Sequence, residues 1–113
     1  MNKLVMTTLL PLRMPVFFIE QGEQNTYPQI VFNIKDTPWE FSDDEQDGCQ
    51  YEINMSLLVK GDYLRLKKEI ERLMVNAGFK KGRGYYPEYS AQLECYIVPL
   101  RFYYYKLDKG EMI

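Results

Sequence analysis

The residues able to do chemistry are few in this chain, and they do not form a catalytic set. The 113-residue sequence contains no histidine, which removes the commonest general base and every histidine-dependent triad. Its two cysteines, Cys49 and Cys95, lie in no metal-ligand or reactive spacing. We expect both to be free thiols, as is usual in a reducing compartment. No catalytic, cofactor-binding or metal-binding residue is predicted, and we do not expect an enzyme.

One acidic run resembles a metal site. Asp43-x-Glu45-x-Asp47-Gly48 is similar to the start of a calcium-binding loop. The twelfth position of such a loop would be Asn54 instead of the usual glutamate, and expected strands flank the run where a calcium loop has helices. A solvated or partner-facing acidic loop is the better interpretation.

A short basic run suggests nucleic-acid binding. Gly82-Arg83-Gly84 stands beside several tyrosines, which is typical of some RNA-binding segments. A single copy in a chain of formal charge −2 is more typical of a tight turn, because nucleic-acid binding depends on neutralising many phosphates. The spacing is also not that of a phosphate-binding loop.

The charged residues are segregated along the chain. From Glu20 to Glu52 there are nine acids and one base, and from Lys60 to Arg83 there are eight bases and three acids. Opposite charges on two regions can pair within one chain or between two copies of it.

The element that organises the chain is an amphipathic helix expected between Gly61 and Phe79. Asp62 is expected to cap its first turn, and Gly78 to end it in the left-handed conformation and return Phe79 onto Met74. Apolar residues at steps of three and four form its buried stripe: Tyr63, Leu66, Ile70, Leu73, Met74 and Ala77.

Strands are expected on both sides of this helix. Residues 50–60 alternate most clearly, with the apolar side chains at odd positions on one face. Apolar runs predict a buried strand at 16–19, a strand at 29–34, and a final strand pair or one long strand in which Pro99 marks a bulge or an edge position. Residues 3–10 predict a short helix, 36–48 a long acidic connection, and 80–84 a flexible basic turn.

This order indicates a single α+β domain over residues 1–113. We expect a mostly antiparallel sheet covered on one face by one main amphipathic helix plus a short N-terminal helix. With no run of 18 apolar residues and no cleavage signal, neither a membrane span nor a secreted protein is predicted.

Two segments carry a family resemblance. They are Leu12-Arg13-Met14-Pro15-Val16-Phe17-Phe18 and, after a polar loop, Tyr27-Pro28-Gln29-Ile30-Val31-Phe32. With the following irregular loop, alternating strand, amphipathic helix and terminal strands, the arrangement over residues 9–106 resembles the bacteriophage tail completion family. This family includes the tail terminators and the tail-to-head joining proteins of long-tailed phages.

The resemblance implies a structural virion protein of the tail or neck, assembled in the bacterial host cytoplasm. It implies a homo-oligomeric ring, usually a hexamer, that caps the tail tube protein and docks to head-tail connector proteins. DNA would pass through the ring without specific binding, and the role requires neither a cofactor nor a membrane. Alternatives are a head-side neck, connector or minor capsid protein, and a small phage-encoded host-directed regulator whose acidic loop would mimic nucleic acid.

The connection from Asp36 to Asp47, the acidic loop, is predicted to be an assembly surface. It carries six acids, no base and two large aromatics, a composition suited to an interface anchor with a polar rim. Its counterpart would be the basic region of a neighbouring copy, or it would line the lumen of the tube. The predicted interface residues are Trp39, Phe41, Asp43, Asp44, Glu45, Asp47, Lys67, Lys68, Arg72, Lys80, Lys81 and Arg83.

Overall fold

The computed structural model describes residues 1–19, 27–39 and 48–107. Two helices, one 3-10 turn and six strands follow one another along these residues: α1 (Asn2–Leu9), η1 (Leu10–Leu12), β1 (Val16–Phe18), β2 (Gln29–Trp39), β3 (Gly48–Val59), α2 (Leu64–Asn76), β4 (Lys80–Lys81), β5 (Glu88–Ser90) and β6 (Cys95–Leu107).

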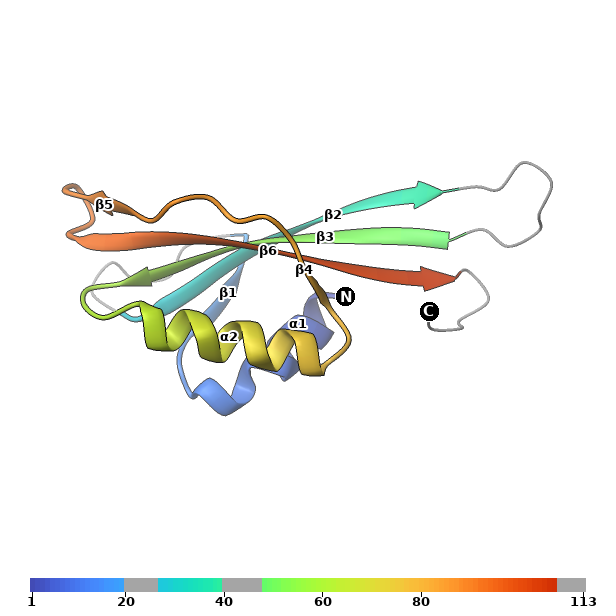
Figure 1. The fold of residues 1–113 in the computed structure, drawn as a ribbon, viewed down its shortest axis with the longest axis horizontal. Helices are drawn as coiled ribbons and strands as arrows, with labels where there is room; N and C mark the ends of the chain where they lie inside the picture. The colour runs from blue at the N-terminus through green and yellow to red at the C-terminus, as the bar shows by residue number, and fades with distance from the viewer. Residues whose placement is uncertain (20–26, 40–47, 108–113) are drawn as a thin grey trace.

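The six strands form one sheet in the order β1-β2-β3-β6-β4, with β5 also paired to β6. β1 runs parallel to β2, and the other pairs are antiparallel. Figure 1 shows α1 and α2 on the same face of the sheet, so neither helix of the described residues covers the second face. The predicted α+β class is confirmed.

The boundaries of α2 follow from its capping residues. The Asp62 carboxylate accepts a hydrogen bond from the Leu64 amide at 3.2 Å. At the other end Gly78 has a φ of 101°, and the Phe79 amide donates to the Met74 carbonyl at 3.0 Å. This is the left-handed helix ending expected from the sequence.

The buried stripe of α2 is shorter than expected. Ile70 and Met74 are fully buried, while Tyr63 and Leu66 pack against the core from its margin. Leu73 is half-buried, but Ala77 is exposed. Ala77 is the C-cap residue, where the helical periodicity no longer fixes which way a side chain points. Its place on the predicted stripe is wrong.

The N-terminal helix lies within a residue of its expected position and buries Val5 and Leu9. Val16 to Ile19 does contain a strand, but the expectation that it is buried is wrong. β1 is the edge strand of the sheet, so Phe18 and Ile19 remain exposed. An apolar run alone does not distinguish an edge strand from a central one.

The core lies between the helices and one face of the three long strands. The alternating residues Ile53, Met55 and Leu57 of β3 are buried in this core. Each of them pairs with a buried residue of β6. Ile70, Met74, Val5 and Leu9 of the two helices belong to the same cluster, as do Phe102, Leu100 and Val98 of β6.

Two expected connections are partly strand. Residues 36–39 belong to β2 and pair with β3, so the long acidic connection is shorter than expected. Likewise, Lys80 and Lys81 form β4 and pair with β6, where a flexible turn was expected. In both places pairing with a long neighbouring strand outweighs the weak strand propensity of Asp, Pro and Lys.

Pro99 occupies an edge position, one of the two alternatives expected. The register of β6 on β3 is continuous through the Ser56–Pro99 pair, so there is no bulge at this point. On the side away from β3, β5 pairs with residues 95–97 and β4 with residues 102–103. Pro99 lies in the interval between them, where its missing amide breaks no ladder.

Candidate interaction surface

The segment 82–87, which we call the strap, connects β4 to β5 along the open interval of β6 (Figure 1). The Gly82 amide donates to the Arg101 carbonyl at 2.8 Å. A Cβ atom on Gly82 would lie 2.6 Å from Cε2 of Tyr103, and one on Gly84 would lie 3.1 Å from the Pro99 carbonyl oxygen. The glycines therefore allow a close approach to β6, and the expected tight turn is an extended strap.

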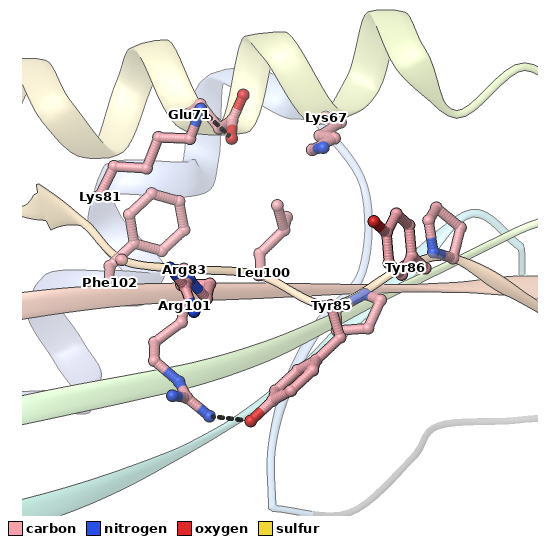
Figure 2. Close-up of a pocket in the computed structure, with 13 residues that line it drawn as sticks. Lys67, Glu71, Lys81, Arg83, Tyr85, Tyr86, Leu100, Arg101 and Phe102 are labelled. Atoms are coloured by element: carbon pink, nitrogen blue, oxygen red, sulfur yellow. Dashed lines mark hydrogen bonds and ion pairs between the residues drawn. The ribbon is translucent and has the colours of Figure 1, made fainter.

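A groove of about 550 Å³ lies between α2 and the strap. Figure 2 shows Lys67 and Glu71 projecting from α2 toward residues of β4, the strap and β6. Lys81 Nζ lies 2.9 Å from Glu71 Oε2. Three basic side chains and one acid line the groove, because the Arg101 guanidinium bonds to Asn54 on the other face of the sheet. Among the described residues neither Lys67 nor Arg83 has an ion-pair partner, so the groove carries a net positive charge.

The uncovered face of the sheet carries a hydrogen-bonded polar row. The Arg101 guanidinium donates from Nε to Asn54 Oδ1 at 3.0 Å and from Nη2 to Tyr85 Oη at 3.4 Å. Asn54 in turn donates to Asn33 Oδ1 at 3.4 Å and to Glu52 Oε2 at 3.0 Å. The row links β2, β3, β6 and the strap.

Arg101 also contacts the strap through its charged guanidinium and the aliphatic part of its side chain. Its guanidinium lies 5.3 Å from the centre of the Tyr85 ring, within the range of a cation–π contact. Hydrogen bonds with Tyr85 and Tyr103 raise the pKa of Arg101 above its ordinary value. Arg101 and Tyr85 line one side of a shallow hollow of about 200 Å³ on this face.

Exposed tyrosines surround the strap and the β5–β6 hairpin. We call Tyr85, Tyr86, Tyr89 and Tyr96 the tyrosine patch. Tyr86 is 91% exposed and Tyr85 66%, and the rings of Tyr89 and Tyr96 are 5.2 Å apart. The Tyr89 and Tyr96 rings meet edge to face, and exposed tyrosines are enriched where proteins bind one another.

A different apolar surface lies at the opposite edge of the sheet. We call Met6, Leu10, Phe18 and Ile19 the β1-edge patch. Leu10 is 68% exposed and Ile19 65%. A hollow of about 300 Å³ opens beside Met6 and Leu10. The strand order places β1 and β4 at opposite ends of the sheet, but Ile19 also lines the hollow on the uncovered face that Tyr85 borders.

The structure divides the basic residues that the sequence placed in one interface. Lys67, Lys81 and Arg83 line the groove. Lys68 and Arg72 are exposed on another side of α2, because residues three and four apart share a helix face and adjacent ones do not. Lys80 Nζ lies 5.5 Å from the centre of the Tyr105 ring. Its side chain points away from that of Lys81, because neighbouring residues on a strand point to opposite faces. The predicted basic set therefore lies on more than one surface of the molecule, and its role in an interface stays a prediction.

The acidic side of the predicted interface is described only in part. The backbone of Trp39 ends β2, paired with Gly48. Outside the described residues lie Phe41, Asp43, Asp44, Glu45 and Asp47. The sequence did not indicate Arg101, Tyr85 or Tyr86; their only signal was the nearby Gly82-Arg83-Gly84 run.

The part of the chain that the structure describes brings no three metal-ligating side chains of His, Cys, Asp or Glu together; the calcium-like run begins outside it. Cys49 and Cys95 are free, as expected. Neither helix, within the same residues, has the length and apolar character needed to cross a bilayer. In comparisons with known proteins, the sequence matches no family model and no curated protein.

Proposed function

We propose that this protein is a tail-completion component of a virion, which forms a ring on the end of the tail tube and joins it to the head. The observation that carries the proposal is a pair of unlike exposed surfaces centred on opposite edges of one sheet, which among the described residues approach one another only at the hollow that Ile19 and Tyr85 share. A head-to-tail contact requires two different patches on each copy, and such contacts close into a ring when the rotation between copies allows.

The arrangement of the resembling segments supports the same role. Val16 pairs with Ile30 and Phe18 with Phe32, so the two segments that resemble the tail completion family form adjacent parallel strands. In this proposal the β1-edge patch of one copy packs on the tyrosine patch of the next. The two flat sides of the ring are then left for the tail tube protein and for the head-tail connector proteins.

The first test is the size of the wild-type protein under native conditions. Sedimentation and electron microscopy should find closed rings, free in solution or at the ends of added tail tubes. A protein that remains a monomer or dimer and does not bind tail tubes would overturn the proposal and favour a host-directed regulator.

The second test separates a head-to-tail contact from a symmetric one. Ile19→Asp damages the β1-edge patch, and Tyr86→Asp damages the tyrosine patch. Each variant alone should be monomeric, whereas an equal mixture should form heterodimers that cannot grow further. Val75→Asp, at an exposed apolar position on α2, is the matched control and should assemble like the wild type. A Tyr86→Asp variant that still forms homodimers through its β1 edge would contradict the head-to-tail arrangement.

A further inference from the structure

The groove between α2 and the strap carries two bases, Lys67 and Arg83, without ion-pair partners among the described residues, and the same chain carries a segment of opposite charge. We propose that this groove binds residues 40–47, the acidic segment, of a second copy of the chain. The inference rests on the self-association proposed above and adds the pair of elements that sets its register.

The groove offers both charge and apolar surface to such a segment. Lys67 and Arg83 lie at it without ion-pair partners among the described residues, while Lys81 is already paired with Glu71. The apolar surface available to a ligand is the exposed ring of Tyr86, because Leu100 and Phe102 at the floor of the groove are buried in the core (Figure 2). A ligand that matches this lining is an anionic peptide with at least one aromatic side chain.

The acidic segment has this chemistry. Five of its eight residues are acids, none is a base, and Phe41 is an aromatic among them. Complementary charges of this kind mainly increase the encounter rate and exclude wrong partners. A buried aromatic anchor supplies more of the affinity than the charges at the rim.

The segment cannot fill the groove of its own chain. It leaves β2 at Trp39 and enters β3 at Gly48, two residues that pair with one another. Pro99, at the far end of the groove, is level with Ser56, which lies about 27 Å from Gly48 at roughly 3.4 Å per residue. An eight-residue excursion that must return to its start reaches only about 15 Å. The whole groove is therefore accessible only to the segment of another copy.

The positions of the two elements agree with a head-to-tail contact. β2 leads into the acidic segment and is the neighbour of β1 in the strand order, although its last residue, Trp39, is seven residues past Phe32, where the pairing with β1 ends. The groove lies along β6 next to the tyrosine patch, on the other side. A head-to-tail contact that includes both charged elements must therefore extend beyond the β1-edge patch toward the Trp39 end of β2.

A charge exchange tests the pairing. Lys67→Glu with Arg83→Glu in the groove, or Asp43→Lys with Asp44→Lys in the segment, should weaken self-association on the order of tenfold at low salt, with a smaller effect at high salt. Both pairs together in one chain should restore it. The control is Arg65→Glu with Lys68→Glu, an equal charge change at exposed positions of the same helix, which should have no such effect.

Crosslinking locates the partner directly. A photoreactive phenylalanine derivative in place of Tyr86 should crosslink to residues 40–47, and in an equal mixture of ¹⁴N- and ¹⁵N-labelled chains half of these products should carry one label of each kind. The same derivative at Val75 is the control. Crosslinks to residues 40–47 of only the same chain, or to other segments, would overturn the inference.

The outcomes distinguish the inference from the proposed function. Wild-type rings that tolerate both charge reversals would refute the acidic-segment contact and leave the ring proposal intact. Absence of any self-association would refute both. Binding of a labelled single-stranded oligonucleotide that requires Lys67 and Arg83, with no crosslink to residues 40–47, would identify nucleic acid as the occupant and overturn the inference.

Discussion

The two faces of the sheet use the same three strands for different purposes. On β3, Ile53, Met55 and Leu57 point into the core under the helices, while Asn54 and Ser56 between them point to the uncovered face. The covered face is apolar and nearly closed to solvent. The uncovered face is held by the hydrogen-bonded row at Arg101 and by the strap. The covered face maintains the fold, and recognition is left to the uncovered face and to the margin of the covered face where the groove lies beside α2.

The largest effect expected from this comparison is at the covered face. Leu57→Ala should lower the free energy of unfolding by about 2–5 kcal/mol, because it leaves a cavity at a fully buried position. Ser56→Ala, one residue away on the other face, should change it by less than about 0.5 kcal/mol. Denaturant unfolding of both variants measures the difference. Similar losses at both positions would mean that the two faces are not distinct in this way.

The next effect concerns the contact of the strap with β6. Gly82→Ala should cost about 1–3 kcal/mol, because its Cβ atom must displace the Tyr103 ring and the stem of Arg101. Gly61→Ala is the matched control: a Cβ atom there meets nothing within 4 Å, and the change should be neutral or stabilising by up to about 1 kcal/mol. Equal thermal stability of the two variants would show that the strap does not need this close approach.

A smaller effect is expected within the polar row. Asn54→Ala removes the hydrogen bonds that join Arg101, Asn33 and Glu52, and should cost about 0.5–1.5 kcal/mol. Asn33→Ala removes a single bond of 3.4 Å at an exposed position and should cost less. If Asn33→Ala lowers the free energy of unfolding more than Asn54→Ala does, the polar row is not centred on Asn54.

The sequence predicted the covered face well and the uncovered face poorly. Periodicity marks Ile70, Met74 and Leu57 because burial of one face repeats at a fixed step. The capping residues Asp62 and Gly78 act on neighbours in sequence, so they too were found. The fold class follows from these local signals.

The candidate site depends on contacts between residues far apart in sequence, and no periodicity reports those. Arg101 bonds to Asn54 across 47 positions and to Tyr85 across 16. The charge segregation was visible, but it could not show that Lys67 and Lys81 share a groove while Lys68 and Lys80 do not. That division depends on which way each helix or strand residue points after the elements have packed.

The smallest effect is expected on the exposed side of α2, which borders neither face of the sheet. Glu69 and Arg72 form a hydrogen-bonded ion pair there, and the bond from Arg72 lowers the pKa of the Glu69 carboxyl below its ordinary value of 4.5. A carboxyl whose pKa is lowered by folding contributes stability above its unfolded pKa, and this contribution disappears as the pH falls through the lowered, folded value. An exposed pair of this kind contributes little and is weakened by salt.

Arg72→Gln should therefore raise the pKa of Glu69 toward 4.5 while barely changing the unfolding midpoint at neutral pH. An NMR titration of the Glu69 side chain measures the first, and thermal unfolding the second. Lys68→Gln removes a base from the same helix without touching this hydrogen bond, and should leave the pKa nearly unchanged. A pKa that moves equally in both variants would mean that the general positive charge of α2, and not the bond from Arg72, is the cause. That result would make α2 a uniformly basic surface and weaken the distinction between its groove side and its exposed side.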